Sequence, residues 1–134
     1  MLFSIDESNP QPLYLQLVSQ VKEQIRNGTL VPGDELPSVR ELADILGINL
    51  HTIHNAYKKL RDEGLITLRL GQRAKIARRN NKPLSDTAID TALKGRLHEL
   101  ITDAYLMGLS SDDLREYINR QLDIVAGADD IHNK

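Results

Sequence analysis

Residues 36–64 read LPSVRELADILGINLHTIHNAYKKLRDEG, and this stretch decides the fold. Ser38 followed three residues later by Glu41 is a capping-box pattern, which predicts the start of a first helix. Gly47 ends that helix, because glycine readily adopts the left-handed conformation of a helix C-cap. Asn49 is a favoured N-cap for a second helix. Two short helices joined by a tight glycine turn are typical of a helix-turn-helix motif.

Both helices of this motif have apolar residues at helical spacing, which predict their buried faces. In the first helix these residues are Leu42, Ala43, Ile45 and Leu46. In the second helix they are Ile53, Ala56, Tyr57 and Leu60. The opposite face of the second helix holds His51, Asn55 and Lys58, flanked by Thr52, His54, Lys59 and Arg61. A recognition helix turns such side chains toward DNA, whereas an ordinary solvated helix face is the alternative interpretation.

The segments on either side of the motif complete a winged helix-turn-helix. Residues 1–11 predict an extended arm, residues 12–27 predict a helix across the motif, and Leu36 enters a short strand. After the second helix, two short apolar stretches around Gly71 and Gln72 predict a β-hairpin, which in this position is a wing. The wing cations are Arg69, Arg73, Lys75, Arg78 and Arg79. Arginine suits a narrow minor groove, and a basic hairpin without a partner is the alternative.

The C-terminal part predicts two more helices, one from Asp86 to Met107 and one that begins after Ser110. Two helices cannot bury such apolar stripes by themselves, so we expect a second copy of the chain to cover them. A helical hairpin packed only on its own domain is the alternative. The predicted fold class is therefore mainly α with a small β-hairpin wing. The expected divisions are a DNA-binding domain 1–79, a linker 80–85, a two-helix dimerisation segment 86–126 and a frayed tail 127–134.

The composition restricts the class of protein. The 134 residues suit one domain or two small ones, and the lack of cysteine excludes a disulfide scaffold and a thiolate metal site. No apolar run approaches the roughly 18 residues of a membrane span and no signal peptide opens the chain, so we expect a soluble, cytoplasmic protein. The net charge is −2, yet residues 58–82 hold 9 Lys and Arg against 2 Asp and Glu. Such a basic patch is an electrostatic footprint for phosphate.

Long stretches of the chain match one family pattern, notably GTLVPGDELPSVRELA at 28–43, LGIN at 46–49 and LRDEGLI at 60–66. Residues 10–77 thereby resemble the winged helix-turn-helix of the GntR family of bacterial transcription regulators. The two-helix tail is similar to that of the YtrA-like subgroup of this family. The wing departs from the family pattern, because Arg73 stands where its second glycine is usual.

This resemblance implies roles for individual residues. It implies that Arg40 contacts DNA, that Thr52 contacts a phosphate or a base, and that Gly71 forms the wing tip. Many members of the family carry arginine at the positions of Leu50 and His54. Because arginine is the usual reader of guanine, we expect the operator to depend less on guanine at these positions.

We therefore predict a homodimeric, sequence-specific transcription regulator, a repressor on a pseudo-palindromic double-stranded operator. The predicted DNA-binding residues are Arg40, Asn49, Leu50, His51, Thr52, His54, Asn55, Lys58, Lys59, Gly71, Gln72, Arg73 and Lys75. A winged helix used as a protein-interaction module is the alternative, and a salt titration separates the two. We expect no enzyme activity, cofactor or metal, since His51 and His54 have no third ligand nearby in sequence. The sequence does not indicate a small-molecule effector.

Overall fold

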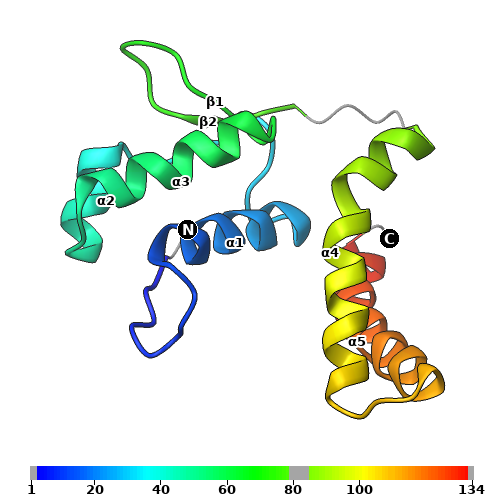
Figure 1. The fold of residues 1–134 in the computed structure, drawn as a ribbon. Coiled ribbons are helices and arrows are strands. Elements are labelled where there is room, and N and C mark those ends of the chain that lie inside the picture. The colour runs from blue at the N-terminus through cyan, green and yellow to red at the C-terminus, as the bar shows by residue number, and fades with distance from the viewer. Residues whose placement is uncertain (1–2, 79–84, 133–134) are drawn as a thin grey trace. The chain divides into compact units, whose positions relative to one another are not determined.

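The computed structural model describes residues 3–78 and 85–132, with side chains up to residue 125, and divides the chain into compact units of residues 1–79 and 80–134. The first unit contains α1 (Leu13–Arg26), α2 (Val39–Leu46), α3 (Leu50–Asp62), β1 (Ile66–Thr67) and β2 (Lys75–Ile76) (Figure 1). The second contains α4 (Asp86–Leu106) and α5 (Ser111–His132). This is the predicted fold class. Apart from Ser85, the linker predicted at 80–85 lies outside the described residues, as does Arg79.

The N-terminal arm is tied to α1 by glutamine side chains. Gln16 is buried although it is polar, with 5 % of its surface exposed. Its side-chain oxygen accepts from the N–H of Asp6 at 3.0 Å, and its NH₂ group donates to the carbonyl oxygens of Asp6 and Gln11 at 3.1 and 3.0 Å. Gln20 accepts from the N–H of Ser4 at 3.0 Å. The arm is therefore part of the folded first unit.

The helix-turn-helix has the predicted caps. The N–H of Glu41 donates to the hydroxyl of Ser38 at 3.1 Å, and the N–H of Ser38 donates to the Glu41 carboxylate at 3.4 Å, which completes the capping box of α2. Gly47 ends α2 at a φ of 66°, in the left-handed region. The side chain of Asn49 accepts from the N–H of His51 at 2.8 Å and caps α3. These bonds satisfy backbone groups that helix ends leave without partners.

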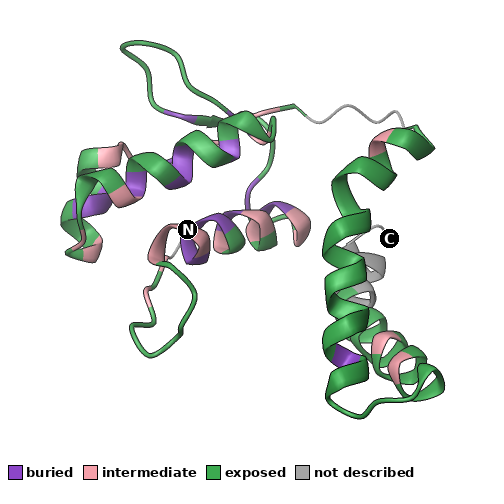
Figure 2. Cartoon of the chain, in the orientation of Figure 1, coloured by how far each residue is buried: buried purple, intermediate pink, exposed green. Residues whose placement is uncertain are grey.

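The core of the first unit lies between its helices and the base of the wing. Buried residues lie along facing sides of α1 and α3 (Figure 2). The buried residues of α3 are the predicted Ile53, Ala56, Tyr57 and Leu60. In α2, Leu42 and Ala43 are buried, but the prediction for Ile45 is wrong, since 71 % of its surface is exposed. Helix geometry turns Ile45 about 110° away from the midline between Leu42 and Ala43.

The wing is a β-hairpin with a tight turn at its tip. Its two strands are antiparallel and pair Ile66 with Ile76 and Thr67 with Lys75. The N–H of Gln72 donates to the carbonyl oxygen of Arg69 at 3.0 Å and closes a β-turn. Gly71 occupies the third position of this turn with a φ of 77°, where glycine avoids the strain that a side chain would cause.

A further backbone segment pairs with the outer side of β2. Glu35 forms an antiparallel bridge with Lys75, and the N–H of Leu36 donates to the carbonyl oxygen of Ala74 at 2.8 Å. The short strand predicted at Leu36 is thus a single bridge centred one residue earlier. It connects the segment before α2 to the strand that follows the wing tip.

In the second unit, the start of α4 and the turn between α4 and α5 lie where the sequence predicted them. The hydroxyl of Ser85 accepts from the N–H of Ala88 at 3.1 Å and caps α4, and Gly108 follows α4 with a φ of 93°. The hydroxyl of Ser110 accepts from the N–H of Asp113 at 3.1 Å at the start of α5. However, α5 continues to His132, so residues 127–132, expected to fray, are helical. One glycine inside a helix costs only about 1 kcal/mol relative to alanine.

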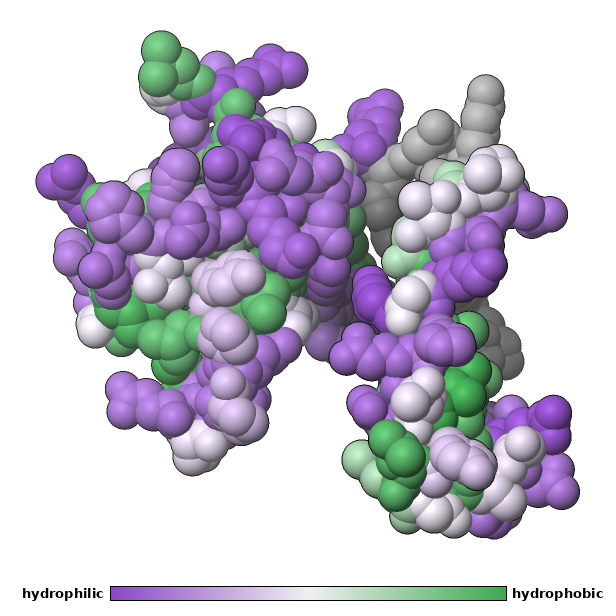
Figure 3. All heavy atoms as spheres, in the orientation of Figure 1, coloured by the Kyte–Doolittle hydropathy of each residue, from purple (hydrophilic) through white to green (hydrophobic). Residues whose placement is uncertain are grey.

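The apolar stripes of the second unit remain largely exposed in the chain. The large residues of α4 with between 40 % and 76 % of their surface exposed include Ile89, Leu93, Leu97, Leu100, Ile101 and Tyr105. Ala104 is the buried hydrophobic residue of α4. Figure 3 shows hydrophobic residues gathered on the surface of this unit. Within the described residues, no helix is both long and apolar enough to span a membrane.

Candidate nucleic-acid interface

The outer face of α3 carries the polar residues that the sequence placed there. The exposed residues are His51, His54, Asn55, Lys58 and Lys59, with Thr52 partly exposed. They lie opposite the stripe that α3 buries against α1 and α2. Hydrogen-bonding side chains therefore stand toward the N-terminal end of the helix and cations toward its C-terminal end. Asparagine pairs with adenine edges and lysine with guanine edges or phosphates, so this face can read and hold a duplex.

The start of α3 combines a cap with an exposed apolar side chain. Asn49 uses its side-chain oxygen to cap the helix, which leaves its NH₂ group oriented by the cap and able to donate to an anion. Leu50, the first residue of α3, has 42 % of its surface exposed. An apolar side chain at this position can contact a thymine methyl group in the major groove.

Arg40 lies exposed in the first turn of α2. A positive charge there is disfavoured by the helix dipole, whose N-terminal end is itself positive. Helix stability therefore does not account for an arginine at this position. An external anion such as a DNA phosphate would satisfy both Arg40 and the N-terminal end of α2.

The tip of the wing is exposed to solvent, whereas one of its arginines forms an ion pair within the chain. Gly71, Gln72 and Lys75, which belong to the predicted site, are exposed. Arg73 instead donates from its two Nη atoms to the two carboxylate oxygens of Glu41, at 2.7 and 2.5 Å. The bonds from Arg73 hold the pKa of Glu41 below its usual range, and the Glu41 carboxylate raises the pKa of Arg73. Arg73 thus has an intramolecular partner in addition to its position on the wing.

The role of Glu41 as this partner could not be predicted from the sequence. From the sequence, Glu41 is explained by its place in the capping box of α2, and 32 residues separate Glu41 from Arg73. The neighbouring Tyr57 also belongs to this cluster, because its hydroxyl donates to the carbonyl oxygen of Pro37 at 2.6 Å. Burial raises the pKa of the Tyr57 phenol above its usual value, so the group stays a donor at neutral pH.

Acidic residues limit the basic surface at the end of α3. Arg61 pairs with Asp62 at 3.0 Å, and Lys22 of α1 pairs with Glu63 at 3.0 Å. These pairs partly neutralise the cations near the C-terminal end of α3. The positive charge available for phosphate is therefore concentrated on the outer face of α3 and on the wing.

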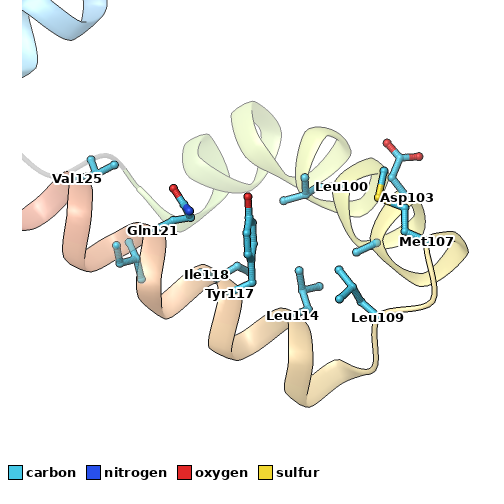
Figure 4. Close-up of a pocket in the computed structure, with 11 residues that line it drawn as sticks. Leu100, Asp103, Met107, Leu109, Leu114, Tyr117, Ile118, Gln121 and Val125 are labelled. Carbon is cyan, nitrogen blue, oxygen red and sulfur yellow. The ribbon is translucent and has the colours of Figure 1, made fainter.

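A groove of about 700 Å³ separates α4 from α5 (Figure 4). Leu100 from α4 and Tyr117 from α5 point into this space, and Met107, which follows α4, also lines it. The polar groups in its lining come from Asp103, Tyr117 and Gln121. The size is that of ligand pockets in general, but the walls belong to the same apolar stripes that the chain leaves exposed.

Nothing in the described residues forms a metal centre. Across residues 3–78 and 85–132 there is no group of three or more His, Cys, Asp or Glu residues able to hold a metal ion. His51 and His54 are both exposed on α3. Their place on the helix is consistent with contacts to another molecule.

The first unit has the architecture of a winged helix-turn-helix DNA-binding protein. Residues 13–76 match the model of the family described as bacterial regulatory proteins, gntR family. The chain is 38 % identical to the HTH-type transcriptional repressor YtrA of Bacillus subtilis (strain 168), over 87 % of this chain and 89 % of that protein. The chain therefore belongs to the GntR family and is a DNA-binding transcriptional regulator, not an enzyme.

Solved structures extend the similarity to both units. YtrA from Sulfolobus acidocaldarius, a GntR-family transcription factor, is 33 % identical with a TM-score of 0.55, covering 92 % of this chain and 99 % of that one. A transcriptional antiterminator from Listeria monocytogenes EGD-e is 27 % identical with a TM-score of 0.79, covering 90 % of each chain. The fold of the whole chain, with its two C-terminal helices, is therefore shared with these proteins.

Proposed function

We propose that this protein is a homodimeric, sequence-specific repressor that binds a pseudo-palindromic operator in double-stranded DNA. The observation that carries this proposal is the exposed polar face of α3, next to Arg40 on α2 and the basic wing. Occupation of the operator would block transcription by excluding the polymerase. The assignment as a repressor is supported by the similarity to YtrA of Bacillus subtilis, which is a transcriptional repressor.

In this complex α3 lies in the major groove, with its N-terminal residues against base edges. The base-facing residues are Leu50, His51, Thr52, His54 and Asn55. The phosphate-facing residues are Arg40, Asn49, Lys58 and Lys59. The wing tip follows the DNA backbone through Gly71, Gln72 and Lys75. Phosphate contacts give affinity and register, whereas base contacts give sequence preference.

The second copy of the chain joins through α4 and α5. Leu97, Leu100 and Ile101 each expose between 46 % and 52 % of their surface in the chain. Removing this apolar surface from water is favourable, at about 25 cal/mol per Å², and the groove beside Tyr117 would receive side chains of the partner. Two copies then present two α3 helices to successive major grooves.

Binding of the full-length protein to DNA duplexes of random sequence, followed by selection and sequencing, tests the proposal. We expect a two-fold-related sequence to emerge, and we expect its affinity to fall steeply as salt is raised, because bound phosphates release counterions. The variant in which Asn55 and Lys58 are both replaced by alanine should no longer enrich any sequence from the pool. Replacing Arg115 and Lys94, two exposed cations of the second unit, with alanine serves as the control.

A different result identifies the alternative. If no sequence is enriched and binding is absent at low salt, the winged helix acts as a protein-interaction module. The polar, positively charged outer face of α3 argues against this alternative, because protein-interaction cores are depleted of charge.

A further inference from the structure

The wing is anchored by its backbone only at its base. The N–H of Ile76 donates to the carbonyl oxygen of Asp34 at 2.8 Å, and the N–H of Leu36 donates to the carbonyl oxygen of Ala74 at 2.8 Å. Arg73 is the next residue toward the tip. The tip itself is closed by the β-turn that ends at Gln72, which fixes its shape but not its direction relative to α3.

The side chain of Arg73 supplies a link at the point where this anchoring stops. It reaches Glu41 on α2 through two parallel hydrogen bonds, at 2.7 and 2.5 Å. A bidentate pair between arginine and a carboxylate has one preferred geometry, so it constrains direction as well as distance. Arg73 therefore restricts the orientation of the wing beyond the last backbone hydrogen bond that holds its base.

Glu41 is itself held at the start of α2. Its carboxylate also accepts from the N–H of Ser38 at 3.4 Å, within the capping box. The segment just before α2 is held to α3, because the Tyr57 hydroxyl donates to the carbonyl oxygen of Pro37 at 2.6 Å. A continuous set of bonds thus runs from α3 through the start of α2 to the wing.

We propose that Arg73 is a positioning residue that fixes the wing relative to α3 through Glu41, and that its guanidinium does not itself bind DNA. The inference rests on the DNA-binding role proposed above and changes the sequence-based prediction for Arg73. If Arg73 left Glu41 for a phosphate, the carboxylate would face the DNA backbone without its cation. Repulsion between these two negative charges opposes that exchange.

A double-mutant cycle on the full-length protein tests the proposal. The variants are Glu41→Gln, Arg73→Gln and the combination, and glutamine at position 41 can still complete the capping box. Affinity for the duplex selected from the random pool is measured at several salt concentrations. We expect each single substitution to weaken binding by roughly threefold to tenfold, and the combination to weaken it no further than either single change.

The salt dependence separates positioning from direct contact. Loss of one phosphate contact lowers the slope of log affinity against log salt by about 0.9. We expect Arg73→Gln to leave the slope unchanged. Arg69→Gln is the matched control for the loss of one positive charge, because it removes a cation from the wing while the Glu41–Arg73 pair stays intact.

Amide hydrogen exchange in the free protein provides a readout without DNA. Both single variants should exchange faster at Leu36, whose N–H bonds to Ala74 beside the link. The N–H of Gly33, which donates to Ile76 at 2.9 Å further from the link, should be unchanged.

Two outcomes overturn the proposal. If Arg73→Gln weakens binding and lowers the slope while Glu41→Gln leaves affinity equal or higher, Arg73 contacts DNA itself. If exchange at Leu36 is unaltered in both variants, the pair does not position the wing, whatever happens to DNA binding. Failure of the wild-type protein to bind any duplex, with faster exchange still seen in the variants, rejects the proposed function but not the structural link.

Discussion

At the scale of single residues, Arg40 offers the simplest test of the interface. The side chain is exposed in the first turn of α2, where the helix dipole disfavours its charge. Arg40→Ala should weaken binding to the selected duplex by about 1–3 kcal/mol, the worth of a charge-assisted contact. The free energy of unfolding should stay equal or rise slightly, because an unfavourable charge is removed.

The two quantities are measured by fluorescence anisotropy with labelled DNA and by urea denaturation. Arg115→Ala, which removes an exposed arginine from α5, is the control for the loss of one positive charge. Equal DNA affinity in wild type and Arg40→Ala would exclude Arg40 from the site.

At the scale of elements, the attachment of the arm to α1 depends on one buried amide. Gln16→Ala removes three hydrogen bonds to the backbone of Asp6 and Gln11. Because these backbone groups lose their partner in a partly buried place, the free energy of unfolding should fall by about 1–3 kcal/mol. Chemical denaturation measures the loss, and limited proteolysis should release the arm earlier.

Gln20→Ala is the matched control for Gln16→Ala. Gln20 also binds the arm, through Ser4, but at an exposed place where water replaces the lost bond. Its substitution should cost less than about 1 kcal/mol. Similar losses in both variants would show that burial of Gln16 contributes nothing to the attachment.

The elements also show what could be predicted from sequence and what could not. Helix starts were predictable because caps depend on neighbours within about three residues, as for Ser38 in α2 and Ser85 in α4. The buried stripe of α3 followed from its periodicity, and the outward face followed with it. Contacts between distant residues left no local signal: Gln16 resembles an ordinary surface residue, and Glu41 an ordinary cap. Ile45 was misplaced because α2, with only 8 residues, leaves the centre of its apolar face ambiguous.

At the scale of the whole molecule, the exposed surface of α4 predicts how assembly can be broken. Leu97 lies on α4 with 51 % of its surface exposed, so Leu97→Glu should leave the fold of the chain intact. A charge placed within an apolar interface is costly, so the proposed dimer should weaken on the order of tenfold or more. Operator affinity should fall with it, since in the proposed dimer two linked α3 helices bind together.

Sedimentation equilibrium measures the association, and circular dichroism checks the helix content. Lys94→Glu changes the charge beside the polar residues Asp90, Thr91 and His98 of α4, and should leave the association nearly unchanged. A Leu97→Glu protein that associates like wild type would place the interface elsewhere.

The bridge between Glu35 and Lys75 has a consequence for the order in which the first unit folds during synthesis. It closes a chain segment of about 40 residues that contains both α2 and α3, at an entropic cost of roughly 3 kcal/mol on a logarithmic scale of loop length. A nascent chain that ends before Lys75 can form the helices but lacks the strand that closes the segment around them. The fold of the winged helix-turn-helix should therefore be completed in one step, once Ile76 has left the ribosome.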